Sequence, residues 1–101
     1  MSYHIVWSDS ALDRVTEFLD FIAEDNPSAA RRVIQDLFDR VQALSDHPYL
    51  GRRLLEGVDP SLRRIVIGSY IVVYEVLEAR KTISIVAVRH HRQKLLPQEE
   101  P

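Results

Sequence analysis

The stretch AVRHHRQKLL, residues 87–96, holds the side chains best suited to chemistry in this 101-residue chain. It places two adjacent histidines, His90 and His91, between Arg89 and Arg92. An unperturbed histidine has a pKa of about 6.5 and can serve as a base at neutral pH, whereas guanidinium groups hold phosphates and carboxylates. The two arginines would lower the pKa of His91 and favour its basic form. The stretch is therefore a catalytic site, a basic contact surface or the solvated end of a strand.

Charge is unevenly distributed along the chain, although the formal net charge is only −2. Residues 1–46 hold nine acidic residues and four arginines, whereas residues 47–94 hold nine basic residues and four acidic ones. This asymmetry predicts an acidic protein segment or a polyanion as the partner of the basic half. A dipolar surface without a function would give the same pattern.

The composition is that of one soluble globular domain, with 46% apolar and 28% charged residues. No apolar run approaches the roughly 20 residues of a membrane helix, and the start MSYHIVWSDS does not resemble a signal peptide. The chain has no cysteine, which excludes disulfides and thiolate zinc sites and fits a cytoplasmic location. No two histidines have the i,i+4 spacing of helical metal ligands, so we expect neither a metal nor another cofactor.

Two helices and four strands are predicted to position these side chains. Residues 3–7 are aromatic and β-branched, which indicates a strand. Apolar residues then recur at spacings of three and four over residues 11–23 and 30–44, which predicts two amphipathic helices. Asn26 and Pro27 end the first helix and cap the second, so we expect an antiparallel hairpin.

Three β-branched runs follow, at residues 62–67, 70–77 and 82–88, after a predicted surface loop over residues 49–60. Gly68-Ser69 suits a type II′ turn, so the runs should form an antiparallel meander. The predicted fold class is α+β, with the order β-α-α-β-β-β and the helical hairpin packed on one face of an antiparallel sheet. We expect a single domain over residues 1–96 and a short acidic tail over 97–101.

Tight turns at both ends of the central run set the register of the meander. The first turn places Arg63 opposite Tyr74 and Arg64 opposite Val73, and the second places Arg89 opposite Tyr70. One face of the sheet would then carry Arg63, Tyr70, Tyr74 and Arg89. The other would carry Arg64, Ile71, Val73, Val86 and Val88. A slip of one residue would reverse this assignment.

The order and spacing of four motifs, DNPSAA, HPYLGRR, LRRIVIGSYIVVYEV and ISIVAVRHHR, resemble the RelE/ParE superfamily of type II toxin–antitoxin toxins. The resemblance covers about residues 3–94. It implies a small bacterial cytoplasmic toxin that arrests growth, as in plasmid stabilisation systems, and a cognate antitoxin as its partner in a hetero-oligomer. The antitoxin typically wraps the toxin with a helix and an extended segment that folds on binding. The antitoxin also carries the DNA-binding domain, so this chain is expected to bind neither a specific DNA sequence nor a membrane.

The resemblance leaves two targets open. RelE-like members cut mRNA in the translating ribosome, whereas ParE-like members inhibit DNA gyrase without known catalysis. RNA cleavage needs a base, an acid and cations on the phosphate. RelE-like nucleases carry an arginine directly after the first tyrosine of SYIVVYEV, where this chain has Ile71. Leu62 and Arg64 stand in place of nuclease lysines, and Leu95, Leu96 and Pro97 stand where RelE has a tyrosine.

The nuclease alternative depends on the histidine pair. AVRHHR resembles the Arg-x-His-aromatic strand end of YoeB-like nucleases, with Arg92 in place of the aromatic residue. The resemblance would make His91 the acid/base. Arg64, Arg89 and Arg92 would then hold the phosphate.

The ParE-like interpretation is favoured, because NPSAA and the sequence Val88, Arg89, His90 with nearby Arg92 resemble ParE motifs and Ile71 fits a binding toxin. The aromatic residues, Phe21 among them, are expected in core or hairpin packing. Phe21 lies slightly off the apolar stripe of its helix, so an edge contacted by a partner is the alternative for it. A toxin that has lost its activity, or a module with another binding role, is the third class. The side chains expected to contact the antitoxin or the target are Arg52, Arg53, Arg63, Arg64, Tyr74, Arg89, His90, Arg92 and Lys94.

Overall fold

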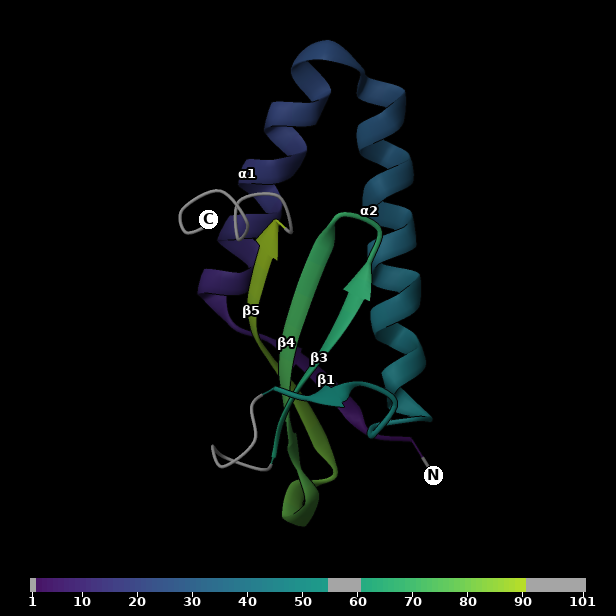
Figure 1. The fold of residues 1–101 in the computed structure, drawn as a ribbon, viewed down its shortest axis with the longest axis vertical. Coiled ribbons are helices and arrows are strands. Elements are labelled where there is room, and N and C mark those ends of the chain that lie inside the picture. Colours follow the sequence, from purple (N-terminus) through teal and green to yellow (C-terminus); the bar gives the residue numbers. More distant parts are fainter. Residues whose placement is uncertain (1, 55–60, 91–101) are drawn as a thin grey trace, which may run out of the picture.

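A sheet of five strands carries a hairpin of two helices on one face (Figure 1). The computed structural model describes residues 2–54 and 61–90. In chain order, the elements are β1 (His4–Trp7), α1 (Asp9–Asp25), α2 (Pro27–Gln42), a 3₁₀ turn (Ala43–Ser45), β2 (Arg52–Arg53), β3 (Leu62–Ile67), β4 (Tyr70–Leu77), a second 3₁₀ turn (Glu78–Arg80) and β5 (Thr82–His90). The predicted α+β class and the predicted helical hairpin are confirmed.

Each helix begins at a side-chain cap, and the predicted Asn26 cap of the second helix is confirmed. The Ser8 hydroxyl accepts a hydrogen bond from the backbone N–H of Ala11 at 3.1 Å, and Asn26 Oδ1 accepts one from Ala29 at 3.0 Å. These bonds satisfy backbone donors that have no partner inside a helix. Pro27 occupies the first turn of α2, where its missing N–H costs nothing. The helices therefore meet at one residue and pack side by side.

The sheet has the strand order β1-β5-β4-β3-β2. Strands β3, β4 and β5 form the predicted antiparallel meander, and Gly68 has the positive φ of +59° that the predicted turn requires. The prediction of an entirely antiparallel sheet is wrong, because β1 pairs parallel to β5. The helical hairpin is the long crossover that allows two strands to run in the same direction. Strand β2 adds a fifth strand inside the segment that was predicted as a loop.

A β-bulge changes the register in the middle of the β4–β5 pair. The predicted pairing of Leu77 with Thr82 is confirmed, but the register shifts between Val73 and Tyr74. Val73 lies opposite Ala87 and Tyr74 opposite Ile85, so Val86 is the extra residue of the bulge. Beyond the bulge, Tyr70 lies opposite His90 and Ile71 opposite Arg89. The prediction that Arg89 lies opposite Tyr70 and shares its face is therefore wrong.

The hydrophobic core lies between the helical hairpin and the sheet. It combines alternate residues of β4 and β5 with the inner stripes of α1 and α2. Trp7 packs edge-on against Phe38, with ring centroids 4.9 Å apart. Val88 belongs to this core, so the prediction that it lies on the opposite face with Arg64 is wrong. Burial of one large aliphatic side chain here contributes roughly 1.5–3 kcal/mol to the free energy of folding.

Candidate functional site

The arginines and tyrosines singled out in the sequence lie on two different faces of the sheet. Directly opposed residues of neighbouring strands share a face, and successive residues alternate. Arg63 and its partner Tyr74 therefore lie on the helix-covered face, whereas Arg64 and its partner Val73 lie on the open face. The bulge also moves Arg89 to the open face, opposite Ile71. Arg64 and Arg89 are thus brought together, and Arg63 and Tyr74 are separated from them.

Tyr74 holds the segment that follows α2 against the sheet. Its side chain is 0% exposed, and its hydroxyl donates to the Pro48 carbonyl and accepts from the Gly51 N–H, both at 2.9 Å. Burial raises the pKa of the Tyr74 hydroxyl, so it remains a neutral donor. A Cβ at Gly51 would lie 2.5 Å from the Arg64 carbonyl oxygen, so only glycine fits at this position. Tyr74 therefore has a structural role and does not face a partner.

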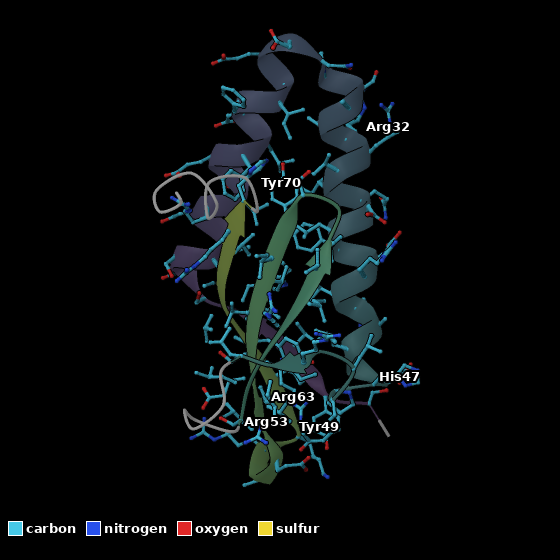
Figure 2. The ribbon with its side chains drawn as sticks, viewed as in Figure 1. Arg32, His47, Tyr49, Arg53, Arg63 and Tyr70 are labelled. Carbon is cyan, nitrogen blue, oxygen red and sulfur yellow. The ribbon has the colours of Figure 1, made fainter. Side chains whose placement is uncertain are left out.

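Arg63 belongs to the same structural network. Its Nη1 donates to the Gly51 carbonyl at 2.7 Å, and its guanidinium lies over the Tyr49 ring at 4.9 Å from the centroid. Figure 2 shows Arg63 and Tyr49 together, at the end of the sheet far from Tyr70. Its Nε is buried without a hydrogen-bond partner among the described residues. The motif HPYLGRR thus connects its tyrosine and glycine to the strand LRRIVI.

The open face of the sheet carries a groove of about 660 Å³, which we call the open-face groove. Aliphatic side chains of β3, β4 and β5 make its floor, and Ile71 is only 2% exposed although it lies away from the helices. The guanidinium-bearing side chains in it are Arg64 and Arg89. The described residues that line it are Leu54, Leu62, Arg64, Ile71, Val73, Val86, Ala87 and Arg89.

This arrangement can bind an anion on an apolar surface. Arginine is a donor only and stays protonated in proteins, so Arg64 and Arg89 can hold a carboxylate or phosphate but cannot exchange protons. Among the described lining residues, none can accept a proton near neutral pH. Ile71 lies opposite Arg89, at the position where the resemblance would put a phosphate-binding arginine in a RelE-like nuclease. Its aliphatic side chain cannot bind a phosphate.

His90 lies on the helix-covered face, apart from Arg89. Its ring packs edge-on against Tyr70 with centroids 5.2 Å apart, and against Phe18 with centroids 5.9 Å apart. Successive strand residues alternate, so the bulge that turns Arg89 outward also turns His90 inward. His91, Arg92 and Lys94, predicted as catalytic or contact residues, lie outside the described residues.

Arg52 and Arg53 form the whole of β2 and are exposed. Arg52 lies opposite Arg64, and Arg53 lies opposite Arg63. Phe21 is 74% exposed on α1, so the expectation of core packing is wrong for it, and the alternative of an edge contacted by a partner stays a prediction.

A cluster around Glu78 was not anticipated from the sequence. The Glu78 carboxylate accepts hydrogen bonds from the hydroxyls of Tyr3 and Tyr49 and pairs with Lys81. The bond from Tyr49 lowers the pKa of Glu78, and the bond to Glu78 raises the pKa of Tyr49 to about 12. The cluster joins three segments distant in sequence, which no local pattern reveals.

Within residues 2–54 and 61–90, no group of three or more histidine, aspartate and glutamate side chains could hold a metal ion. In the same part of the chain, neither helix combines the length and the hydropathy of a membrane span.

The sequence matches, over residues 5–95, the family described as ParE toxin of type II toxin-antitoxin system, parDE. The chain belongs to the ParE toxin family. A curated protein of Sinorhizobium fredii, named "Putative toxin Y4kP", is 33% identical over 92 residues, which cover 89% of this chain and 90% of that protein. The superfamily predicted from the four sequence motifs is thereby confirmed.

Solved structures of toxin–antitoxin systems share the fold of this ParE family member. The chromosomal ParDE system of P. aeruginosa matches with a TM-score of 0.73 and 18% identity, covering 88% of this chain and 96% of that chain. The RelBE2 complex of Mycobacterium tuberculosis matches with a TM-score of 0.62 and 19% identity, covering 89% and 99%. The fold is thus common to ParE-type and RelE-type structures and does not distinguish between them.

Proposed function

We propose that this ParE family toxin arrests growth by binding and inhibiting DNA gyrase, and that the open-face groove is its contact site. One observation carries the proposal: Arg64 and Arg89 stand on an aliphatic floor that includes the buried Ile71. Such a surface binds a partner through apolar contact and charge-assisted hydrogen bonds.

We further propose that a cognate antitoxin neutralises the toxin in a cytoplasmic hetero-oligomer. Support comes from the family description, which names a toxin–antitoxin system, and from the fold shared with toxins solved as antitoxin complexes. The excess of basic residues in the second half of the chain suits an acidic partner.

The test is induced expression with two readouts, the SOS response and the integrity of mRNA on translating ribosomes. Gyrase inhibition predicts growth arrest with SOS induction and intact mRNA. Replacing Arg64 and Arg89 together with alanine should abolish the arrest without loss of folding. Arg80→Ala, an exposed arginine outside the groove, is the matched control. Growth arrest with mRNA cleavage and no SOS response would overturn the proposal.

The alternative is a ribosome-dependent mRNA endonuclease, and one observation favours it. Arg64 and Arg89 line the same groove, where two guanidinium groups can hold a phosphate. His91 would have to supply the base and Arg92 a further cation. Under this alternative, His91→Ala should abolish toxicity while antitoxin binding stays intact, whereas the gyrase mechanism predicts undiminished toxicity.

A further inference from the structure

The shortest ladder of the sheet holds two pairs of opposed arginines, one pair on each face. Arg52 lies opposite Arg64 and Arg53 opposite Arg63 in the β2–β3 pair. Like charges directly opposed in a sheet are destabilising. Arg63 bonds to the Gly51 carbonyl, but none of the ion pairs among the described residues involves any of the four. The Arg52–Arg64 pair therefore concentrates positive charge that an anionic partner would neutralise.

A second groove, of about 430 Å³, begins at this ladder and separates the end of α2 from β3. We call it the edge groove. Two large apolar side chains, Leu50 and Val66, stand open at it, with exposed fractions of 64% and 53%. Arg40, Arg52 and Arg64 also line it. Among the described residues, Arg40 pairs only with Asp36, at 3.5 Å in an exposed i,i+4 contact, which holds it weakly.

The backbone of β3 is unpaired along part of this groove. The bonds Val76 N–H to Ser61 O and Leu54 N–H to Leu62 O show that odd-numbered residues of β3 bond to β4 and even-numbered residues face β2. The next even-numbered residue beyond the β2 ladder is Val66. The residue that would pair with it, Leu50, donates its N–H to His47 instead. Among the described residues, Val66 therefore has no strand opposite its outward N–H and C=O.

We propose that the edge groove binds an extended acidic segment of a partner protein, which pairs with the backbone of Val66 as an added strand. One apolar side chain of the segment covers Leu50 and Val66, and its carboxylates bind Arg40, Arg52 and Arg64. Strand addition of this kind combines main-chain hydrogen bonds with pockets for alternate side chains. The inference rests on the proposed function in that the antitoxin supplies the segment.

Binding here also reaches the open-face groove. Arg64 lines both grooves, so a carboxylate that engages it from the edge groove competes with the target for the same guanidinium. Neutralisation then needs only this shared side chain and does not require the antitoxin to fill the open-face groove. The segment acts as a competitive inhibitor of target binding.

The direct test is amide hydrogen exchange of the toxin, alone and saturated with its purified cognate antitoxin. Exchange of the Val66 amide should slow at least about tenfold on binding. The Ile67 amide, which pairs with β4, should already be protected in the free toxin and serves as the internal control. Unchanged exchange at Val66 in a saturated complex overturns the inference.

Two variants test the contacts separately. Val66→Pro removes the outward N–H without touching a bond to β4, and it should weaken antitoxin binding about tenfold, whereas Val66→Ala keeps the N–H and should weaken it less. Arg52→Glu, at an exposed position that cannot unfold the core, should weaken binding by a similar factor and reduce its salt dependence. Wild-type affinity in both Val66→Pro and Arg52→Glu would overturn the inference.

Two further outcomes separate this inference from the proposed function. Protection of Val66 in the toxin alone that rises with toxin concentration would identify a second copy of the chain as the occupant and overturn the inference, while growth arrest stands. No growth arrest by the wild-type chain would overturn the proposed function, whatever the exchange of Val66 shows.

Discussion

Arg63 and Arg64 are neighbours in β3, but their side chains lie on opposite faces of the sheet and have different contacts. Arg63 points to the helix-covered face, where it is fixed by the Gly51 carbonyl and the Tyr49 ring. Arg64 points to the open face and lines both grooves without an ion-pair partner among the described residues. The alternation of a β-strand thus separates one arginine that supports the fold from one that is available to a partner. A basic motif must be divided by face before its charges are counted as a binding surface.

Because the network around Arg63 supports the fold, substitutions in it should lower the free energy of unfolding. The largest loss is expected at Gly51. Gly51→Ala would place a Cβ 2.5 Å from the Arg64 carbonyl oxygen, a backbone atom that cannot move aside cheaply. We expect the free energy of unfolding to fall by about 3 kcal/mol. Chemical denaturation measures the change. An unchanged midpoint would show that the segment after α2 does not depend on this close approach.

Tyr74→Phe should have the next largest effect. It removes the hydroxyl that bonds to Pro48 and Gly51 and leaves both backbone groups without that partner. The expected loss in the free energy of unfolding is about 2 kcal/mol. Toxicity should persist at temperatures where the variant is folded, because Tyr74 does not face either groove. Loss of toxicity in a fully folded variant would place Tyr74 in the binding site and contradict the comparison.

On the open face, the expected effects reverse. Arg64→Ala should change the free energy of unfolding by less than about 0.5 kcal/mol, since its guanidinium makes no ion pair with the described residues. The same change should weaken inhibition of the target about tenfold or more. Arg89→Ala should behave alike. A dose–response series with each purified variant tests this prediction, and a stability loss without a loss of inhibition would refute it.

The smallest effect is expected at the Glu78 cluster, which lies in solvent. Glu78→Gln should lower the pKa of Tyr49 from about 12 towards its ordinary value of 10, as followed by tyrosinate absorbance. The raised pKa of Tyr49 implies a contribution to stability that is present below pH 10 and lost as the pH rises towards 12. The lowered pKa of Glu78 implies a contribution that is present above its ordinary value of 4.5 and lost as the pH falls through the lowered one. If the Tyr49 titration is unchanged in the variant, the cluster does not form in solution.

The sequence predicted the elements well because their signals are local. Asn26-Pro27 marks the boundary of two helices by capping chemistry, and Gly68 marks a turn by its positive φ. The bulge at Val86 has no such signal, since neither glycine nor proline lies near it. The bulge places Arg89 on the same face as Arg64, so the candidate site could not be assembled from the pattern alone.

Two further features depended on contacts between distant segments. β1 pairs in parallel with β5 because of how the helical hairpin packs on the sheet, and the residues of β1 alone do not indicate this pairing. Strand β2 consists of two arginines, which have no strand pattern, and it pairs because Gly51 fits against Arg64 and Tyr74. The Glu78 cluster likewise depends on contacts between segments that are distant in sequence.

We propose that the open face of the sheet binds a target and performs no acid–base chemistry. The most direct measurement is DNA supercoiling by purified gyrase in the presence of the wild-type chain and of the Arg64→Ala, Arg89→Ala double variant, with a parallel assay of mRNA on translating ribosomes. We predict that the wild type inhibits supercoiling, that the folded double variant does not, and that mRNA stays intact with both. Uninhibited supercoiling together with cleaved mRNA would contradict the account.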